Sequence, residues 1–516
     1  KQLIQLHGKV LKDGAVLEGE GTNAQGAWIR WSAIQNKKTE LQPLTSLKPD
    51  TLHNGAVWFP NMAFGNTEVQ KTKTILFKDA TVWTNEKEGI LVGADVLVQD
   101  GKIIKVSRQS IAAPAGARVV DAKGLHLTSG IIDEHSHIAI SKGVNEGGQS
   151  ISAEVSIADV VNPDDIDIYR QLAGGVTAAQ LLHGSANAIG GQSALIKLKW
   201  GQTPDELLID NAPKFIKFAL GENVKQANWG DFNTVRFPQT RMGVEQVFYD
   251  GFYRAKAYQK EWDAFKAGKT KVAPRVDLEL EVLADILRST CFITCHSYIQ
   301  SEVNMLMHVA DSMGFRINTF THILEGYKVA DKMQKHGVAG STFSDWWAYK
   351  FEVNDAIPYN AALMTEQGVL VCINSDDAEM GRRLNQEAAK TIKYGGLSEE
   401  QAWKLVTLNP AKTLHLDDQM GSVKAGKAAD LVLWTANPLS IEARVSLTMV
   451  DGVVYFEEKE QAQKQLQIEQ ERTRILSLML AANERGEASK APQKKVKKHF
   501  HCDTLGEEAT ETENSH

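Results

Sequence analysis

Short apolar runs separated by turn residues occur near both ends of the chain. Residues 74–106 hold several such runs, and Asp100-Gly101 separates two of them. An Asp-Gly pair between two apolar runs is a strong signal for a two-residue hairpin turn. Residues 428–455 have the same pattern of short apolar runs, with a second hairpin signal at Asp451-Gly452. Each region is too small to bury a core alone, so we expect the two to pair into one β-domain built from both chain ends.

Between these regions, short apolar runs that end in polar residues alternate with helical patterns. Residues 302–310 and 329–335 carry the apolar spacing of amphipathic helices. Alternation of strands and helices over this length favours a parallel sheet and suits a (β/α)8 TIM barrel. The predicted strands are residues 130–133, 176–180, 215–219, 291–295, 316–320 and 368–373.

The expected fold class is therefore α/β, with a β-rich extension first and then the two parts of the β-domain on either side of the barrel. A helical and then disordered tail would follow. In order, these segments are residues 1–73, 74–127, 128–415, 416–456 and 457–516. Within the barrel, residues 221–275 would form a helical excursion.

Composition narrows the class of protein. The chain has 516 residues, of which 43% are hydrophobic and 23% charged, as is ordinary for a globular protein. No apolar run in the sequence reaches the roughly 18 residues that a transmembrane helix needs, so a membrane partner is not expected. The formal net charge of −7 differs from the basic surfaces that bind nucleic acid, so nucleic acid is not expected either.

Cysteine usage and the first residue bear on the cellular context. Four cysteines are far too few for a disulfide scaffold. Cys291, Cys295 and Cys372 lie in apolar runs, where a free thiol usually behaves as a small hydrophobe. The chain begins at Lys1 rather than methionine, which favours a processed chain or a fragment. We therefore expect a periplasmic or secreted location rather than a cytoplasmic one.

Two histidines mark the end of the first predicted barrel strand. Residues 130–134 run directly into His135-Ser-His137. Because side chains alternate along a strand, His135 and His137 share one face, about 6–7 Å apart along it. Two imidazoles directed into one pocket are a metal-binding arrangement, whereas two histidines in a surface loop are the alternative.

Three more ionisable groups follow predicted strands in the same way. His296, His322 and Asp376 each stand just past the carboxyl end of a strand. TIM barrels place their active sites at that face. The sequence therefore predicts that these groups converge with His135 and His137 in one metal-binding pocket.

These motifs resemble the amidohydrolase superfamily, and the resemblance covers roughly residues 74–456. Members carry His-x-His on the first barrel strand, Lys or Glu on the fourth, His on the fifth and sixth, and Asp on the eighth. Residues 409–412 and 421–432 are similar to the segment with which the family's chains usually leave the barrel. The sequence pattern is most similar to that of the imidazolonepropionase-like and prolidase-like branch. The resemblance implies a small β-sandwich built from both chain ends and one or two divalent metal ions, with zinc expected.

The resemblance leaves two candidates for the fourth-strand ligand. Lys217 lies within residues 215–219, where many members carry a carboxylated lysine that bridges two metals. Glu222, a little further along, is the rival because other members use a carboxylate there. Lys217 is the preferred ligand, and a partly buried lysine that snorkels outward is the alternative interpretation.

His183 and a C-terminal motif complete the candidates. His183 closes a predicted strand and precedes a glycine-rich loop, residues 184–192, that would present backbone amides to a substrate or form a tight turn. We expect His183 to help a metal stabilise an oxyanion. His499-Phe-His-Cys502 repeats the His-x-His spacing, but it follows a lysine-rich stretch and not an apolar strand, so it is assigned to the tail.

The predicted function is that of a metal-dependent amidohydrolase. Metal-activated water would attack the carbonyl of an amide, a cyclic amide or a peptide, and Asp376 would move the proton to the leaving nitrogen. The partner would be a small-molecule substrate, and a homo-oligomer is compatible with the sequence. A deaminase of ring amidines is an alternative. It is weakened because the first glutamate after His296 is Glu302, so the sequence lacks a His-x-x-Glu arrangement there. A non-catalytic scaffold or binding barrel is a second alternative. Loss of metal ligands would indicate it, and none of the five core ligands is missing from the sequence.

Overall fold

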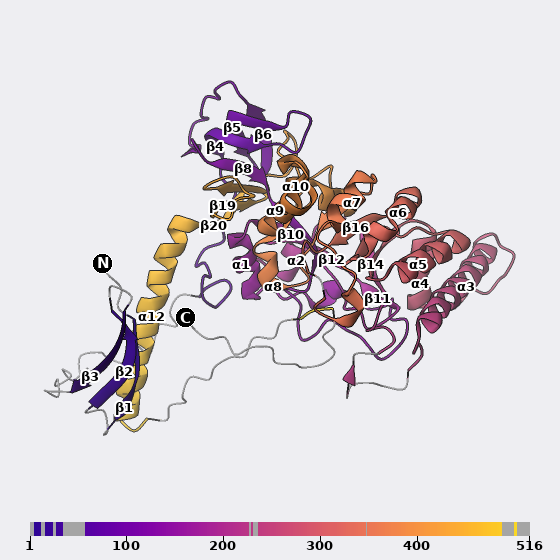
Figure 1. The fold of residues 1–516 in the computed structure, drawn as a ribbon, viewed down its shortest axis with the longest axis horizontal. Helices are drawn as coiled ribbons and strands as arrows, with labels where there is room; N and C mark the ends of the chain where they lie inside the picture. Colours follow the sequence, from indigo (N-terminus) through magenta and orange to yellow (C-terminus); the bar gives the residue numbers. More distant parts are fainter. Residues whose placement is uncertain are drawn as a thin grey trace. The chain divides into compact units, whose positions relative to one another are not determined.

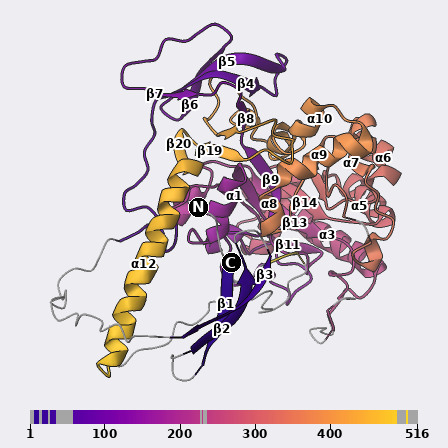
Figure 2. The same ribbon diagram turned by 60° about the vertical axis from the view of Figure 1, so that its left-hand side comes forward.

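The computed structural model describes residues 5–11, 16–23, 27–34, 57–226, 229–230, 236–346, 348–487 and 500–502. The chain divides into two units (Figure 1, Figure 2). The first unit comprises residues 1–55 and 474–490, and the second comprises residues 56–473 and 491–516.

The first unit contains a three-stranded antiparallel sheet. β1 (Gln5–Leu11) pairs with β2 (Val16–Thr22), and β2 pairs with β3 (Trp28–Ile34). The last residues of helix α12 (Glu458–Glu484) also belong to this unit. Every residue of α12 is exposed or half-buried.

Strands from two distant parts of the chain join one eight-stranded sheet in the second unit (Figure 1, Figure 2). Their order is β20 (Val453–Glu457), β19 (Val445–Val450), β18 (Leu431–Trp434), β8 (His126–Ser129), β4 (Ile75–Trp83), β5 (Ile90–Gln99) and β6 (Lys102–Ser107), with β7 (Arg118–Asp121) paired to β4. β18 runs antiparallel to β8, so that Leu433 lies opposite Leu127. Apolar side chains from both parts, including Ile75, Val96 and Leu447, form a single buried cluster. The two ends of the chain therefore share one sheet and one core.

Both predicted hairpin turns are present in this sheet. Asp100 and Gly101 connect β5 to β6, and Asp451 and Gly452 connect β19 to β20. Their φ angles are 50°, 76°, 47° and 75°, respectively. Positive φ at both central residues is typical of a type I′ turn. Aspartate tolerates this conformation at the first position, and glycine adopts it freely at the second.

The strands that position the candidate site form two further sheets. One has the order β12 (Ala194–Lys197), β10 (Val176–Leu181) and β9 (Ile131–Ser136); the other has the order β11 (Ile189–Gln192), β13 (Lys214–Ala219), β14 (Cys291–His296), β15 (Thr319–Thr321), β16 (Ala339–Thr342) and β17 (Val371–Ile373). β9 and β10 are parallel, and so is each neighbouring pair from β13 to β17. The fold is thus mixed α/β, and the backbone ladders of the described residues form two sheets instead of one continuous ring.

Helices follow most of these strands in the chain. The predicted helical patterns lie in α5 (Gln300–Met313) and α6 (Ala330–His336), and α3 (Arg241–Lys266) lies in the predicted helical excursion. The others are α1 (Ile166–Ala173), α2 (Pro204–Leu207), α4 (Leu278–Leu287), α7 (Asn360–Glu366), α8 (Ala378–Gly381), α9 (Leu384–Gly395), α10 (Glu399–Lys404) and α11 (Leu408–Thr413). Among the helices that the structure describes, none combines the length and the apolar character needed to cross a membrane.

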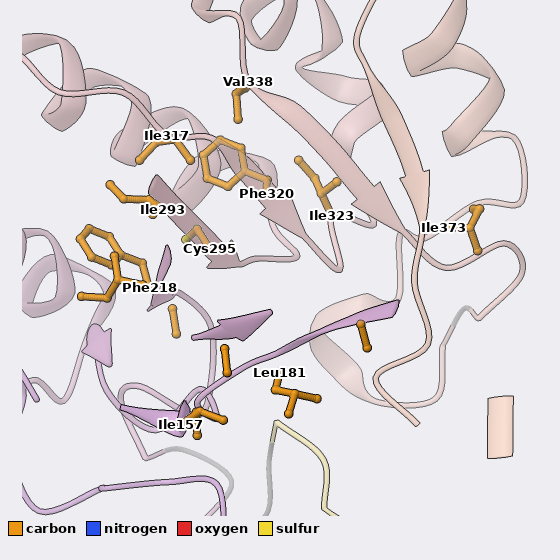
Figure 3. Close-up of a cluster of buried hydrophobic side chains, with 14 of the residues drawn as sticks. Ile157, Leu181, Phe218, Ile293, Cys295, Ile317, Phe320, Ile323, Val338 and Ile373 are labelled. Atoms are coloured by element: carbon orange, nitrogen blue, oxygen red, sulfur yellow. The ribbon is translucent and has the colours of Figure 1, made fainter. Parts of the chain in front are cut away.

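The largest buried apolar cluster packs on one face of the parallel strands (Figure 3). Phe218 of β13, Cys295 of β14 and Phe320 of β15 belong to it. Burial raises the pKa of the Cys295 thiol, which acts here as a small apolar side chain. Because side chains alternate along a strand, Lys217 and His296 lie on the opposite face from their neighbours Phe218 and Cys295. The same strands thereby supply a core on one face and polar groups on the other.

Candidate metal centre

Two histidines at the end of β9 direct their Nε2 atoms into one buried space. The Nε2 atoms of His135 and His137 lie 3.2 Å apart, and both side chains are buried. Nδ1 of His137 lies 2.9 Å from the carbonyl oxygen of Leu182, so this nitrogen carries the proton and donates it there. Nδ1 of His135 lies 2.9 Å from Oγ1 of Thr321, whose hydroxyl lies 3.2 Å from Oε2 of Glu134. These outer partners leave both Nε2 lone pairs available as metal ligands.

His296 at the end of β14 and His322 just after β15 approach the same space. Both rings are fully buried, and their centroids are 5.1 Å apart. Among the described residues, no group hydrogen-bonds either ring nitrogen of His296 or the Nδ1 atom of His322. Buried polar atoms are almost always satisfied, so these nitrogens indicate a ligand that the polypeptide does not supply.

Burial keeps the four imidazoles neutral. It lowers the pKa of His322 to about 3, and it lowers the pKa values of His135, His137 and His296 from their ordinary value. The rings are therefore uncharged at pH 7. This is the form in which histidine binds a metal.

Asp376 follows β17 and faces three of the histidines. Its Oδ1 atom lies 3.1 Å from Nε2 of His137 and 3.4 Å from Nε2 of His135, and its Oδ2 atom lies 3.4 Å from Nε2 of His322. Burial opposes ionisation of this carboxyl, but His322 and His137 outweigh the burial and hold its pKa well below the usual range. Its φ of 49° is a left-handed conformation, which non-glycine residues adopt mainly where the surroundings enforce it. An ionised carboxylate is thus fixed among neutral imidazoles.

The structure separates the two candidates for the fourth-strand ligand. Lys217 points inward from the middle of β13 and is fully buried, with Nζ 3.2 Å from Nε2 of His135. Glu222 lies beyond the end of β13 and is half-buried, and its backbone N–H donates to Oε2 of Glu352 at 3.0 Å. The structure therefore brings Lys217 to the histidines, whereas Glu222 belongs to neither of the two candidate ligand groups formed by the described residues.

His183 follows β10, as the sequence predicts, and backbone groups engage both of its ring nitrogens. The backbone N–H of Glu146 donates to Nε2 of His183 at 2.8 Å, and Nδ1 of His183 lies 2.9 Å from the carbonyl oxygen of Gly184 and donates to it. Burial lowers the pKa of this ring to about 4, so it is neutral. Because both ring nitrogens are engaged by the backbone, His183 anchors the glycine-rich loop and does not present a nitrogen to a substrate.

Cys502 is a site residue that the sequence pattern missed. Its fully buried Sγ atom lies 3.1 Å from Nε2 of His135 and 3.4 Å from Nε2 of His137. The structure thus corrects the assignment of residues 499–502 to a tail with no site role, although His499 lies outside the described residues. The His-x-His-Cys spacing was a usable signal, but a segment outside regular strands has no periodicity that fixes where its side chains point.

The donor atoms form two groups that fit divalent metal ions. Within each group all ligand atoms lie within 4.8 Å of one another. The members are His135, His137, Asp376 and Cys502 in one group, and His296, His322 and Cys502 in the other. Nitrogen and oxygen ligands 2.0–2.2 Å from a tetrahedral metal lie about 3.3–3.6 Å from one another. The separations of 3.1–3.4 Å among His135, His137 and Asp376 are close to these values.

Comparison with known sequences points in the same direction. The sequence model of the amidohydrolase family matches residues 306–455. Over 430 residues, which are 75% of this chain, the sequence is 30% identical to the "Amidohydrolase tasK" of Hapsidospora irregularis, but it spans only 43% of that protein. Over 364 residues it is 22% identical to the imidazolonepropionase of Thermoplasma volcanium, covering 66% of this chain and 83% of that protein.

A solved structure is also similar over most of the chain. The crystal structure of an amidohydrolase from Thermotoga maritima has 31% sequence identity and a TM-score of 0.68. The match covers 74% of this chain and 100% of the Thermotoga chain.

Proposed function

Because the chain belongs to the amidohydrolase family, we propose that it is a metal-dependent hydrolase that cleaves a C–N bond in a small-molecule amide, cyclic amide or peptide. Family membership rests on the match to the whole Thermotoga amidohydrolase at 31% identity, and it makes the chain a hydrolase of C–N bonds. The observation that carries the metal dependence is the convergence of four histidines, Asp376 and Lys217 on one buried space.

The proposed scaffold is a (β/α)8 barrel flanked by a β-sandwich that the two-ended sheet forms. Two features support the barrel. The strands β9–β10 and β13–β17 are parallel, and the backbone N–H of Asp376 after β17 donates to the carbonyl oxygen of His135 in β9 at 3.0 Å. Contact between the last and first strands is what closure of a barrel requires, and barrel enzymes react at the carboxyl ends of their strands.

The proposed metal ligands are His135, His137, His296, His322 and Asp376, and zinc is the preferred metal because it binds both histidine nitrogen and carboxylate oxygen in tetrahedral sites. A bound divalent metal would lower the pKa of a water molecule toward neutrality and polarise the scissile carbonyl. Lys217 is the proposed bridging ligand, as a carboxylated lysine, because its buried Nζ lies beside His135. One or two ions fit this donor set.

Asp376 is the proposed proton carrier. Its carboxylate is ionised and lies at the edge of the ligand cluster, 14% exposed, where a substrate can approach it. It would accept a proton from the attacking water and donate that proton to the leaving nitrogen. His183 is assigned a positioning role, in which its ring holds the loop after β10 through Glu146 and Gly184.

The contacts of Glu302 favour amide hydrolysis over a deaminase reaction. This carboxylate is buried on α5, where its Oε1 atom lies 2.9 Å from Nε of Arg241 and accepts from the backbone N–H of Gly221 at 3.4 Å. A carboxylate engaged in an ion pair is poorly placed to move protons on a ring amidine.

Metal analysis followed by a panel of amides, cyclic amides and dipeptides tests the proposal. We expect one or two divalent ions per chain, loss of hydrolysis after chelation and recovery with zinc. His296→Asn should lose bound metal, whereas His308→Asn, which changes an exposed histidine on α5, should retain it. Hydrolysis by metal-free protein would contradict the metal dependence, and ammonia release from ring amidines alone would favour the deaminase.

A further inference from the structure

Residues His501 and Cys502 are seated in the metal centre by specific contacts. The carbonyl oxygen of Cys502 accepts hydrogen bonds from the backbone N–H of Ser185 at 3.1 Å, from Oγ of Ser185 at 3.2 Å and from Nδ2 of Asn145 at 3.3 Å. Nδ1 of His501 donates to the carbonyl oxygen of Asp376 at 3.0 Å. These contacts hold residues 501 and 502 beside the histidines and thereby position the sulfur.

The sulfur of Cys502 is the one donor that the two ligand groups have in common. It lies 3.1 Å from Nε2 of His135 in the first group and 3.7 Å from Nε2 of His322 in the second. A metal with nitrogen ligands at 2.0–2.1 Å and sulfur ligands at 2.3 Å holds tetrahedral N and S atoms about 3.5–3.6 Å apart. The observed separations bracket this value.

The ring of His296 provides an independent observation that points to a ligand beside the sulfur. His296 is fully buried in the same group as Cys502, and neither of its ring nitrogens has a hydrogen-bond partner among the described residues. A thiol with neutral imidazoles around it and an unsatisfied imidazole nearby is a metal-binding set, since sulfur and nitrogen are the ligands that zinc prefers.

We propose that Cys502 is a thiolate ligand shared by the two ligand groups, and that it closes the metal centre. This inference rests on the proposed function. Catalytic zinc sites keep one position open for water or substrate, whereas sites filled by protein ligands are closed. Ligation replaces the S–H bond by an S–metal bond and releases one proton to solvent; departure of the sulfur takes one proton back. Residues 500–502 therefore act as a built-in inhibitor that must be displaced before hydrolysis.

Cobalt(II) binding to the full chain tests the ligand, because a Co–S bond adds a charge-transfer absorption in the near ultraviolet. The wild type should show this absorption at saturation, and Cys502→Ser should bind Co(II) without it. Cys291→Ser is the matched control, because this buried thiol lies at the start of β14, at the other end of the strand from His296. We expect the control to keep the absorption.

Alkylation of the unmutated protein provides a second measurement that does not depend on a variant folding. Bound metal should slow the reaction of Cys502 with iodoacetamide by about tenfold or more, as read from the labelled peptide, because only the thiolate that is free of metal reacts. Metal-independent labelling of Cys502 would overturn the proposal.

Activity then tests closure separately from ligation. If the closed state outweighs the open state about tenfold, kcat/KM of Cys502→Ser should rise by about tenfold at equal metal content. Equal kcat/KM in this variant and the wild type would overturn closure. A wild type that binds Co(II) and hydrolyses amides without the sulfur absorption would overturn this inference and leave the proposed function intact, whereas failure to bind any metal would remove both.

Discussion

The backbone N–H of Asp376 donates a hydrogen bond to the carbonyl oxygen of His135, with a distance of 3.0 Å. Next to it, the backbone N–H of Ser375 donates to Oδ1 of Asp133 at 3.1 Å. The proposed proton carrier and the first proposed metal ligand are therefore joined through the backbone, and their side chains also face each other. A site held in this way is pre-organised, so substitutions of its side chains test chemistry more than folding.

Thr321→Val should weaken metal binding without unfolding the protein. Oγ1 of Thr321 lies between Nδ1 of His135 and Oε2 of Glu134 and fixes which ring nitrogen of His135 carries the proton. Loss of such an outer partner typically lowers metal affinity by about 10–100-fold. Competition with a chromophoric chelator measures the affinity.

Thr391→Val is the control for that substitution. Thr391 is also a buried threonine, but its hydroxyl donates to the carbonyl oxygen of Ala388 within α9 at 2.7 Å. It should retain wild-type affinity. Equal metal affinities in the two valine variants would show that Thr321 does not orient His135.

Asp95→Asn should destabilise the two-ended sheet in a pH-dependent manner. The Asp95 carboxylate accepts from Nζ of Lys78 at 2.6 Å, from the N–H of Ile111 at 2.7 Å and from the N–H of Asp79 at 3.0 Å. Burial opposes its ionisation, but these donors outweigh burial and lower its pKa. A lowered pKa contributes stability above the unfolded-state value of about 3.9, and this contribution is lost as the pH falls through the folded-state value.

We therefore expect Asp95→Asn to lower the free energy of unfolding by about 1.5–3 kcal/mol at pH 7, the usual range for hydrogen bonds to a charged group. Urea unfolding of both proteins should show this difference shrinking as the pH falls below 4. Asp121→Asn, at an exposed aspartate of β7, should have little effect at either pH. A difference between wild type and Asp95→Asn that grows in acid would contradict the assignment.

Leu433→Ala tests whether apolar packing holds the two chain ends together. Leu433 of β18 is buried in the shared cluster opposite Leu127 of β8, so its truncation should cost about 2–5 kcal/mol. Arg118→Lys is the comparison, because Arg118 makes a two-pronged contact with Glu457 at 2.6 and 2.9 Å near the surface. A partly exposed ion pair contributes about 0–1 kcal/mol. A larger loss for Arg118→Lys than for Leu433→Ala in urea unfolding would reverse this ranking.

Local signals in the sequence were sufficient to predict features that depend on a single strand or turn. The Asp-Gly pairs predicted both two-residue hairpin turns, and the structure gives both turns the two consecutive positive φ angles that favour this dipeptide. The apolar run that ends in His296 likewise predicted β14.

Local signals could not predict contacts between residues that lie far apart in the sequence. The position of Cys502 depends on Ser185, which lies 317 residues away in the sequence, and no repeat or periodicity connects the two. The predicted strand over residues 215–219 ends at the same residue as β13, but the apolar pattern does not show which of Lys217 and Glu222 reaches the histidines, because that depends on contacts with His135 in another strand. His183 looked catalytic because it closes a strand, yet the backbone of the following loop and of Glu146 occupies both ring nitrogens.

Asp376→Asn should preserve the fold and remove most hydrolysis. The amide keeps the shape of the side chain but neither accepts the proton nor supplies a negative ligand, and loss of a general base typically lowers the rate by about 10²-fold or more. Asp377→Asn is the matched control, because Asp377 caps α8 by accepting from the N–H of Met380 at 2.6 Å, and asparagine caps helices equally well. Values of kcat for both variants at equal bound metal check the prediction. Wild-type turnover by Asp376→Asn would mean that another group moves the proton and that metal binding around His135 does not need this carboxylate.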